Sequence, residues 1–153
     1  MGVQAISDAL KKLTLVPPLY RRCFEIVSEE GKAGVAFYAT LGGAAAHGSK
    51  QYLNIVHTAG ASVLVHEAGH VLEQRARETV PSILIKWEKA IDRDGVSVSR
   101  YGDGAVHEDQ AEFARVYAWC LSAGQEHLDT LKAQSPRRYR LWEKILKVSK
   151  AMK

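Results

Sequence analysis

The 153-residue chain has no apolar run that approaches the roughly 18 residues needed to cross a bilayer, so we expect no membrane span. It also lacks a basic start followed by a long apolar stretch, and we therefore see no secretory signal in this sequence. Its two cysteines, Cys23 and Cys120, form no Cys-x-x-Cys pair, which argues against a thiolate zinc site. We expect two buried free thiols, although a disulfide between them stays open.

Repeats, low-complexity segments and linkers are absent, so we expect one domain over residues 1–153. The net charge is only +4, and 46% of the residues are hydrophobic, which is enough for a core. Much of the positive charge lies near the C-terminus, at Arg137, Arg138, Arg140, Lys144, Lys147, Lys150 and Lys153. We interpret these residues as a solvated helix face, with a patch for an anionic partner as the alternative. No nucleic-acid partner is expected, because the aromatic and basic signature of such modules is missing.

Periodicity predicts helices over residues 4–15, 18–30, 61–79, 82–91, 107–122 and 126–133, and a last helix that Ser135 and Pro136 open. Residues 35–41 and 51–56 are predicted strands, paired as a hairpin through a glycine-rich loop at 42–50. This order predicts an α+β domain that is rich in helices, with a small β-sheet preceding the 61–79 helix.

The stretch "VLVHEAGHVLEQ" (63–74) carries the strongest chemical signal. His66 and His70 are four residues apart, so both imidazoles point from one face of a helix and can bind one metal ion. Glu67 lies too far round the helix to be a ligand, but it can reach a water molecule beside them. This is the H-E-x-x-H arrangement of two ligands and a general base. The alternative is that both histidines are hydrogen-bonded core residues.

A catalytic zinc site needs a third protein ligand, and the segment "VHEDQAEFARVYAWC" (106–120) is the best source. Glu108 and Glu112 share one helical face, and apolar neighbours such as Trp119 indicate that this face points inward. We expect Glu108 to bind the metal and Glu112 to accept a hydrogen bond from a ligating histidine. The two glutamates could exchange these roles, and His107 and Asp109 are weaker candidates.

Tyr101 lies in a loop seven residues before Glu108. A tyrosine hydroxyl near a metal ligand can donate a hydrogen bond to a developing oxyanion. Tyrosines also pack commonly at the edges of cores, so the spacing alone leaves this role open.

The motif "HEAGH" (66–70), Tyr101 and "EDQAE" (108–112) together resemble the catalytic domain of anthrax toxin lethal factor and its relatives, among them the small secreted Pro-Pro endopeptidases. The resemblance covers about residues 15–148 and implies a zincin-like metallopeptidase domain of the gluzincin type. It implies Zn²⁺ held by His66, His70 and Glu108, with Glu67 as general base, Tyr101 opposite it and Glu112 as the second acid. Gln110 departs from the family pattern, which usually has an aromatic residue there.

The sequence therefore predicts a zinc-dependent endopeptidase that acts on a protein or peptide in extended conformation. We expect the edge of the strand at 51–56 or 35–41 to pair with the substrate, and Tyr38, Tyr52 and Trp87 to shape subsites. The alternative is a non-enzymatic interaction module with a structural or lost zinc site, whose basic C-terminal helix binds an anionic partner. The resemblance implies a secreted or toxin-associated protein, and a monomer is compatible with each of these hypotheses.

Overall fold

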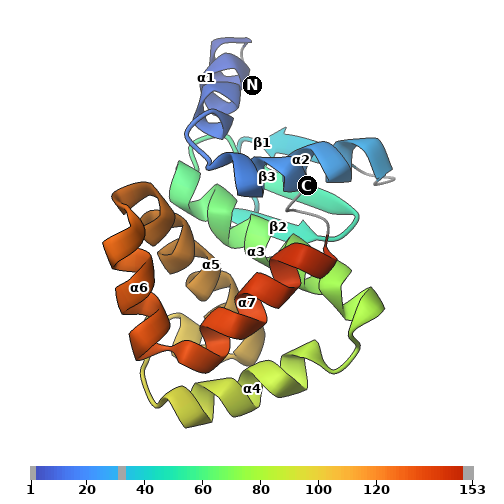
Figure 1. The fold of residues 1–153 in the computed structure, drawn as a ribbon. Helices are drawn as coiled ribbons and strands as arrows, with labels where there is room; N and C mark the ends of the chain where they lie inside the picture. Colours follow the sequence, from blue (N-terminus) through green and yellow to red (C-terminus); the bar gives the residue numbers. More distant parts are fainter. Residues whose placement is uncertain (1–2, 31–33, 150–153) are drawn as a thin grey trace.

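The computed structural model describes residues 3–30 and 34–149, and it shows a helix-rich α+β protein (Figure 1). The described residues form seven α-helices, a short 3₁₀ turn and three strands. The helices are α1 (Val3–Leu13), α2 (Pro18–Glu30), α3 (Ala61–Thr79), α4 (Ile83–Asp94), α5 (Val106–Ala123), α6 (Gln125–Gln134) and α7 (Pro136–Val148), and the 3₁₀ turn is η1 (Gly102–Gly104). The strands are β1 (Gly34–Tyr38), β2 (Ala46–Ser49) and β3 (Tyr52–Val56). The predicted α+β class and the small sheet before α3 are confirmed.

The sheet differs from the predicted hairpin. Its strand order is β1-β3-β2, with β1 parallel to β3 and β2 antiparallel to β3. The expected pairing of residues 35–41 with 51–56 as a hairpin is therefore wrong, because part of the supposed loop forms a strand of its own. That strand, "AHGS", has no β-branched or large aromatic residue, so β-propensity gives no sign of it.

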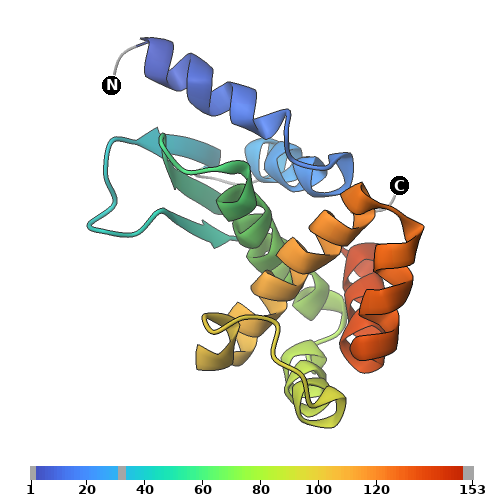
Figure 2. The same ribbon diagram turned by 90° about the vertical axis from the view of Figure 1, so that its left-hand side faces the viewer.

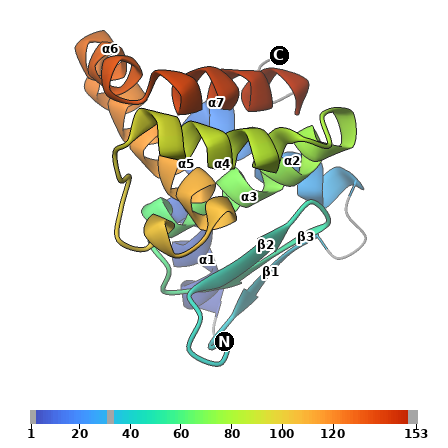
Figure 3. The same ribbon diagram turned by 90° about the horizontal axis from the view of Figure 1, so that it is seen from below.

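Burial follows the central position of β3. Leu53 and Ile55 are almost fully buried, whereas the alternate residues of the strand are only partly covered. Helix α3 packs against β2 on one side and against α5 on another, so the predicted active-site helix lies between the sheet and the other helices (Figure 3). Figure 2 shows α1 projecting from the body beside the sheet.

Aromatic side chains fill the core between α2, α4, α5 and α7. The hydroxyl of Tyr20 donates to the carbonyl of Ala114 at 2.9 Å, and the indole of Trp142 donates to Tyr20 at 3.1 Å. Trp87 is fully buried and packs edge-on against Phe113, so the expectation that Trp87 shapes a substrate subsite is wrong. The indole N–H of Trp87 has a buried acceptor, so burial of this side chain leaves no unsatisfied donor.

That acceptor belongs to a buried polar network that sequence patterning missed. Asp109 accepts from the indole of Trp87 at 2.7 Å and from the guanidinium of Arg138 at 2.8 Å. Arg138 is fully buried and also donates to the carbonyl of Val96 and lies 3.4 Å from Asp94. The interpretation of Arg138 as part of a solvated face is therefore wrong. A buried guanidinium is tolerated here because carboxylates and a carbonyl satisfy its donors.

Other predictions have mixed outcomes. Cys23 and Cys120 are free and buried, as expected. Trp119 is 62% exposed, so the expectation that it marks an inward face is wrong. Lys150 and Lys153 lie outside the described residues. Over the ranges that the structure describes, no helix combines the length and apolar character needed to cross a membrane.

Candidate metal centre

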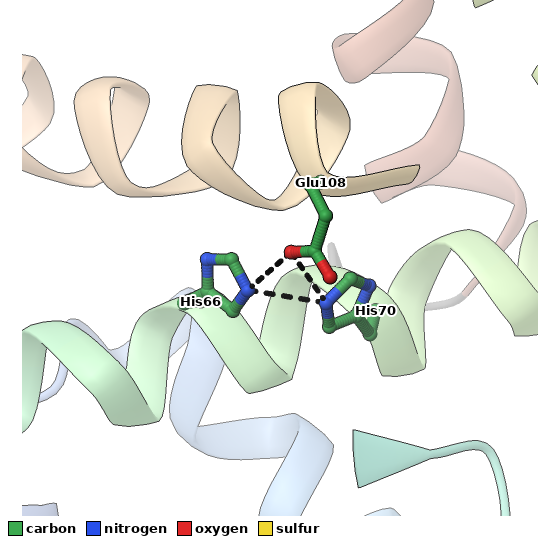
Figure 4. A group of neighbouring side chains, drawn as sticks. All are labelled: His66, His70 and Glu108. Atoms are coloured by element: carbon green, nitrogen blue, oxygen red, sulfur yellow. Dashed lines mark hydrogen bonds and ion pairs between the residues drawn. The ribbon is translucent and has the colours of Figure 1, made fainter. Parts of the chain in front are cut away.

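Helix α3 presents His66 and His70 toward the first turn of α5, which carries Glu108 (Figure 4). Gly69 lets the two helices approach this closely. A Cβ atom on Gly69 would lie 2.9 Å from the Cβ of Ala114 and 3.1 Å from the backbone Cα of Ala111. Gly69 thus makes room for the neighbouring helix.

Three potential ligand atoms converge between the helices. The Nε2 atoms of His66 and His70 are 3.1 Å apart, and Glu108 Oε2 lies 3.0 Å from the first and 3.5 Å from the second. These three residues form a group that could hold a metal ion, each of them offering one ligand atom within 4.8 Å of the other two. All three side chains are largely buried, so water cannot easily solvate the facing atoms.

The hydrogen bonds of His66 fix which of its nitrogens faces the group. Its Nδ1 lies 2.8 Å from Glu112 Oε1, and a carboxylate can only accept, so Nδ1 carries the proton. In the neutral imidazole, Nε2 then carries a lone pair, which points at Glu108. Glu108 Oε2 is buried without a hydrogen-bond partner among the described residues. Buried carboxylate oxygens usually have a partner, and a bound cation would supply one here.

The spacing of these atoms also fits a tetrahedral ion. Bonds of about 2.0–2.1 Å at tetrahedral angles put neighbouring ligand atoms about 3.3–3.4 Å apart. The observed separations of 3.0, 3.1 and 3.5 Å bracket that value. The residues present therefore fit a small divalent cation with nitrogen and oxygen ligands.

Glu112 is placed behind His66 and not among the converging atoms. Burial alone would raise the pKa of Glu112, but hydrogen bonds from Arg115, Ser99 and His66 outweigh burial and lower that pKa. Arg115 Nη1 donates to Glu112 Oε1 at 2.6 Å. Glu112 is thus held as a carboxylate, which keeps the Nδ1 proton of His66 in place.

Burial strongly affects the other two titratable groups of the motif. Desolvation, reinforced by the charge of Glu108, raises the pKa of Glu67 to about 7. Desolvation and the neighbouring His66 lower the pKa of His70 to about 4, so that its imidazole is neutral at pH 7, as a metal ligand must be. A carboxyl with a pKa near neutrality is well suited to accept and return a proton.

Tyr101 lies at the mouth of the site. Its ring is 5.8 Å from the ring of His66, and the side chain is 62% exposed. The charge of Glu108, then burial and the charge of Glu67, raise the pKa of Tyr101, so its hydroxyl remains a hydrogen-bond donor at neutral pH.

The site opens into a cleft of about 700 Å³ between α3, α5 and the chain from Gly43 to Gly48. Both Glu67 and Tyr101 line it, as do Tyr52 and His107. Strand β2 forms one wall, and Gly48 lies so close to the helix that a Cβ there would be 2.7 Å from Glu67 Oε2. The glycine is needed for this close approach.

The sheet order corrects the predicted substrate edge. Strand β3, the predicted strand at 51–56, is central and has no free edge, and β1 lies at the edge remote from β2. The strand that borders the cleft is β2, within the segment 42–50 that the sequence predicts to be a loop. Gly48 was visible in the sequence, but only its proximity to Glu67 shows what it allows.

The competing ligands are placed elsewhere. Asp109 is committed to Trp87 and Arg138 and does not line the cleft. His107 lies at the rim, 3.4 Å from the other oxygen of Glu108, and its side chain is 55% exposed. Gln110, at the position that departs from the family pattern, is buried and donates to the carbonyl of Gly69 at 3.3 Å. It thereby ties α5 to α3 beside the histidines.

Comparisons with known proteins found no protein-family model, no curated protein and no solved structure that matches the chain.

Proposed function

We propose that this chain is a zinc-dependent endopeptidase with a zincin-like catalytic domain, as its resemblance to the lethal factor family implies. One observation carries the proposal: three potential ligand atoms from α3 and α5 converge beside a buried glutamate whose pKa is near 7. His66, His70 and Glu108 would hold Zn²⁺, whose chemistry when bound is to lower the pKa of a water molecule and to polarise the scissile carbonyl.

The proposal assigns distinct tasks to the residues around the cleft. Glu67 accepts the proton of the attacking water and later delivers it to the leaving amine, for which a pKa of about 7 is suitable. Tyr101 donates a hydrogen bond to the oxyanion that forms as the carbonyl becomes tetrahedral. Glu112 keeps His66 in one tautomer and orientation.

The substrate is proposed to bind as an extended strand against β2. This strand pairs with β3 along one edge, and within residues 3–30 and 34–149 no strand pairs with its other edge, which faces the cleft. An extended peptide that adds to such an edge gains backbone hydrogen bonds with little demand on sequence. Tyr52 lines the cleft whereas Tyr38 does not, so Tyr52 remains as the candidate for shaping a subsite among the three predicted aromatic residues.

The geometry favours this function over a structural zinc site. A closed structural site has four protein ligands, whereas the described residues bring three together beside an open cleft. A metal ion held by these three residues would have a further position for water or substrate.

A peptide library incubated with the zinc-loaded protein and read by mass spectrometry tests the proposal. We expect cleavage that a chelator abolishes, that added zinc restores, and that Glu67→Gln lacks while still binding zinc. Glu73→Gln, which changes a second buried glutamate of α3 outside the cleft, is the matched control and should cleave. Equal cleavage by the Glu67→Gln variant, or no cleavage by the wild type at full zinc occupancy, would refute the assignment.

A further inference from the structure

A second hollow, remote from the metal centre, carries an unusual concentration of positive charge. It lies between α4 and α7, which run side by side on the face of the molecule away from the sheet (Figure 3). We call it the α4–α7 groove; its volume is about 450 Å³ and it shares no lining residue with the metal cleft. Its lining residues are Lys86, Lys89, Ala90, Arg93, Arg137, Arg140, Leu141 and Lys144.

The six cations form two matching rows. Lys86, Lys89 and Arg93 follow i, i+3, i+7 spacing on α4, and Arg137, Arg140 and Lys144 repeat that spacing on α7. Residues with this spacing share one helical face, so each row is a continuous stripe of about 10 Å. The sequence pattern had pointed only to α7, because nothing in the sequence indicates that α4 lies beside it.

Hydrogen bonds to the buried carboxylate of Asp94 hold the two rows together at one end. The backbone N–H groups of Arg137 and Arg138 donate to the carboxylate of Asp94 at 3.1 and 3.0 Å. This places the first turn of α7 against the last turn of α4, so the helices are antiparallel and the rows face each other. These hydrogen bonds therefore fix the position of the two rows relative to each other.

Neutralising groups are scarce in the groove. Arg137 pairs with Asp94 at 3.5 Å, but within the described ranges no carboxylate lies within ion-pair distance of the other five cations. The acids Glu88 and Asp92 of α4 line a different hollow, beside η1. Like charges at i, i+4 destabilise a helix, so this segregation has a folding cost that bound anions would offset.

We propose that the α4–α7 groove binds a compact molecule with about three phosphate groups. A phosphate monoester carries about −1.5 to −2 charges near pH 7, so three such groups match six cations, whereas six carboxylates would be needed for the same charge. The volume suits one small ligand. No aromatic side chain lines the groove for stacking of nucleic-acid bases, and a duplex would touch only its rim.

Calorimetric titration of the full-length protein at physiological ionic strength tests this inference, with inositol trisphosphate and inorganic tripolyphosphate as probes. We expect saturable binding of one molecule per chain. Vesicles of phosphatidylcholine with and without phosphatidylinositol bisphosphate then distinguish a lipid headgroup from a free ligand as the source. Binding of a short DNA duplex as tightly as the probes would overturn the proposal in favour of nucleic acid.

The decisive variant is the double charge reversal Lys89→Glu with Arg140→Glu, one change in each row. It should weaken probe binding by more than about tenfold. The matched control reverses Lys132 and Lys147, which are exposed, lie outside the groove and change the net charge equally. The control should bind almost as the wild type does. Equal loss in both variants, or no saturable binding by the wild type, overturns the proposal.

Thermal unfolding gives an independent readout. The groove variant should be at least as stable as the wild type, because it relieves like-charge repulsion. A large drop in its melting temperature would assign these cations a structural role and would contradict the proposal. Peptidase activity is not part of this test, so its result does not depend on the proposed reaction.

Discussion

Replacing Glu67 with glutamine should stabilise the metal-free protein while it destroys the proposed activity. The pKa of Glu67 is raised from 4.5 to about 7, chiefly by burial. At 1.36 kcal/mol for each pH unit between folded and unfolded pKa values, the ionised group costs on the order of 3 kcal/mol. Glutamine resembles the protonated acid in shape and has no such cost.

The sign of the pH dependence follows from the direction of this shift. At pH values well below 4.5 both the folded and the unfolded chain keep Glu67 protonated, so there is no penalty. Between 4.5 and about 7 the unfolded chain releases its proton first, so this group lowers the free energy of unfolding as pH rises. Above about 7 the penalty is complete.

The assay is urea denaturation of the metal-free wild type and the variant at several pH values from 5 to 8. The difference in free energy of unfolding should grow from about 1 kcal/mol at pH 5 to about 3 kcal/mol at pH 8. Comparing the two proteins at each pH cancels the other titrating groups, and Glu88→Gln, on the exposed face of α4, controls for loss of a carboxylate. A difference in free energy of unfolding that stays constant with pH would refute the claim that burial raises the pKa of Glu67.

Three further substitutions test the parts of the site separately. Tyr101→Phe should lower kcat by more than about tenfold at unchanged zinc content, and a wild-type kcat would make Tyr101 a packing residue. Gly48→Ala places a methyl group 2.7 Å from Glu67 Oε2; it should lower kcat while zinc remains bound, and unaltered turnover would contradict the close approach of β2. Gly69→Val should push α3 away from α5, because a Cβ atom at this position would lie 2.9 Å from the Cβ of Ala114. Zinc affinity and melting temperature should therefore both fall. Unchanged zinc affinity would contradict the close approach of the two helices.

Local pattern was sufficient to predict the helices, but not the side that every residue faces, since Arg138 is buried and Trp119 is exposed. The 61–79 helix is reproduced as Ala61–Thr79, because Pro81 and the apolar periodicity limit it from within the sequence. The i, i+4 spacing likewise required His66 and His70 to share a face. That Glu108 would meet them depended on a tertiary contact, which the sequence indicated only through the type of residue and its apolar neighbours.

The features that the sequence could not reveal are long-range contacts between residues that belong to no local sequence pattern. Arg138 was grouped with its solvated neighbours, since burial of a guanidinium depends on Asp94 and Asp109 arriving from other helices. The β2 strand was missed because "AHGS" has low β-propensity and forms a strand only through its partner β3. The pairing of α4 with α7 is a long-range contact as well, and local sequence pattern does not indicate it.

X-ray absorption spectroscopy of the zinc-loaded protein tests the central claim most directly, since it reports the atoms bound to the metal. We expect one zinc per chain with two imidazole nitrogens, one carboxylate oxygen and one further oxygen from water, and near-complete loss of zinc in His70→Ala and Glu108→Ala. Stoichiometric zinc in either variant, or a spectrum without two imidazoles, would contradict the account.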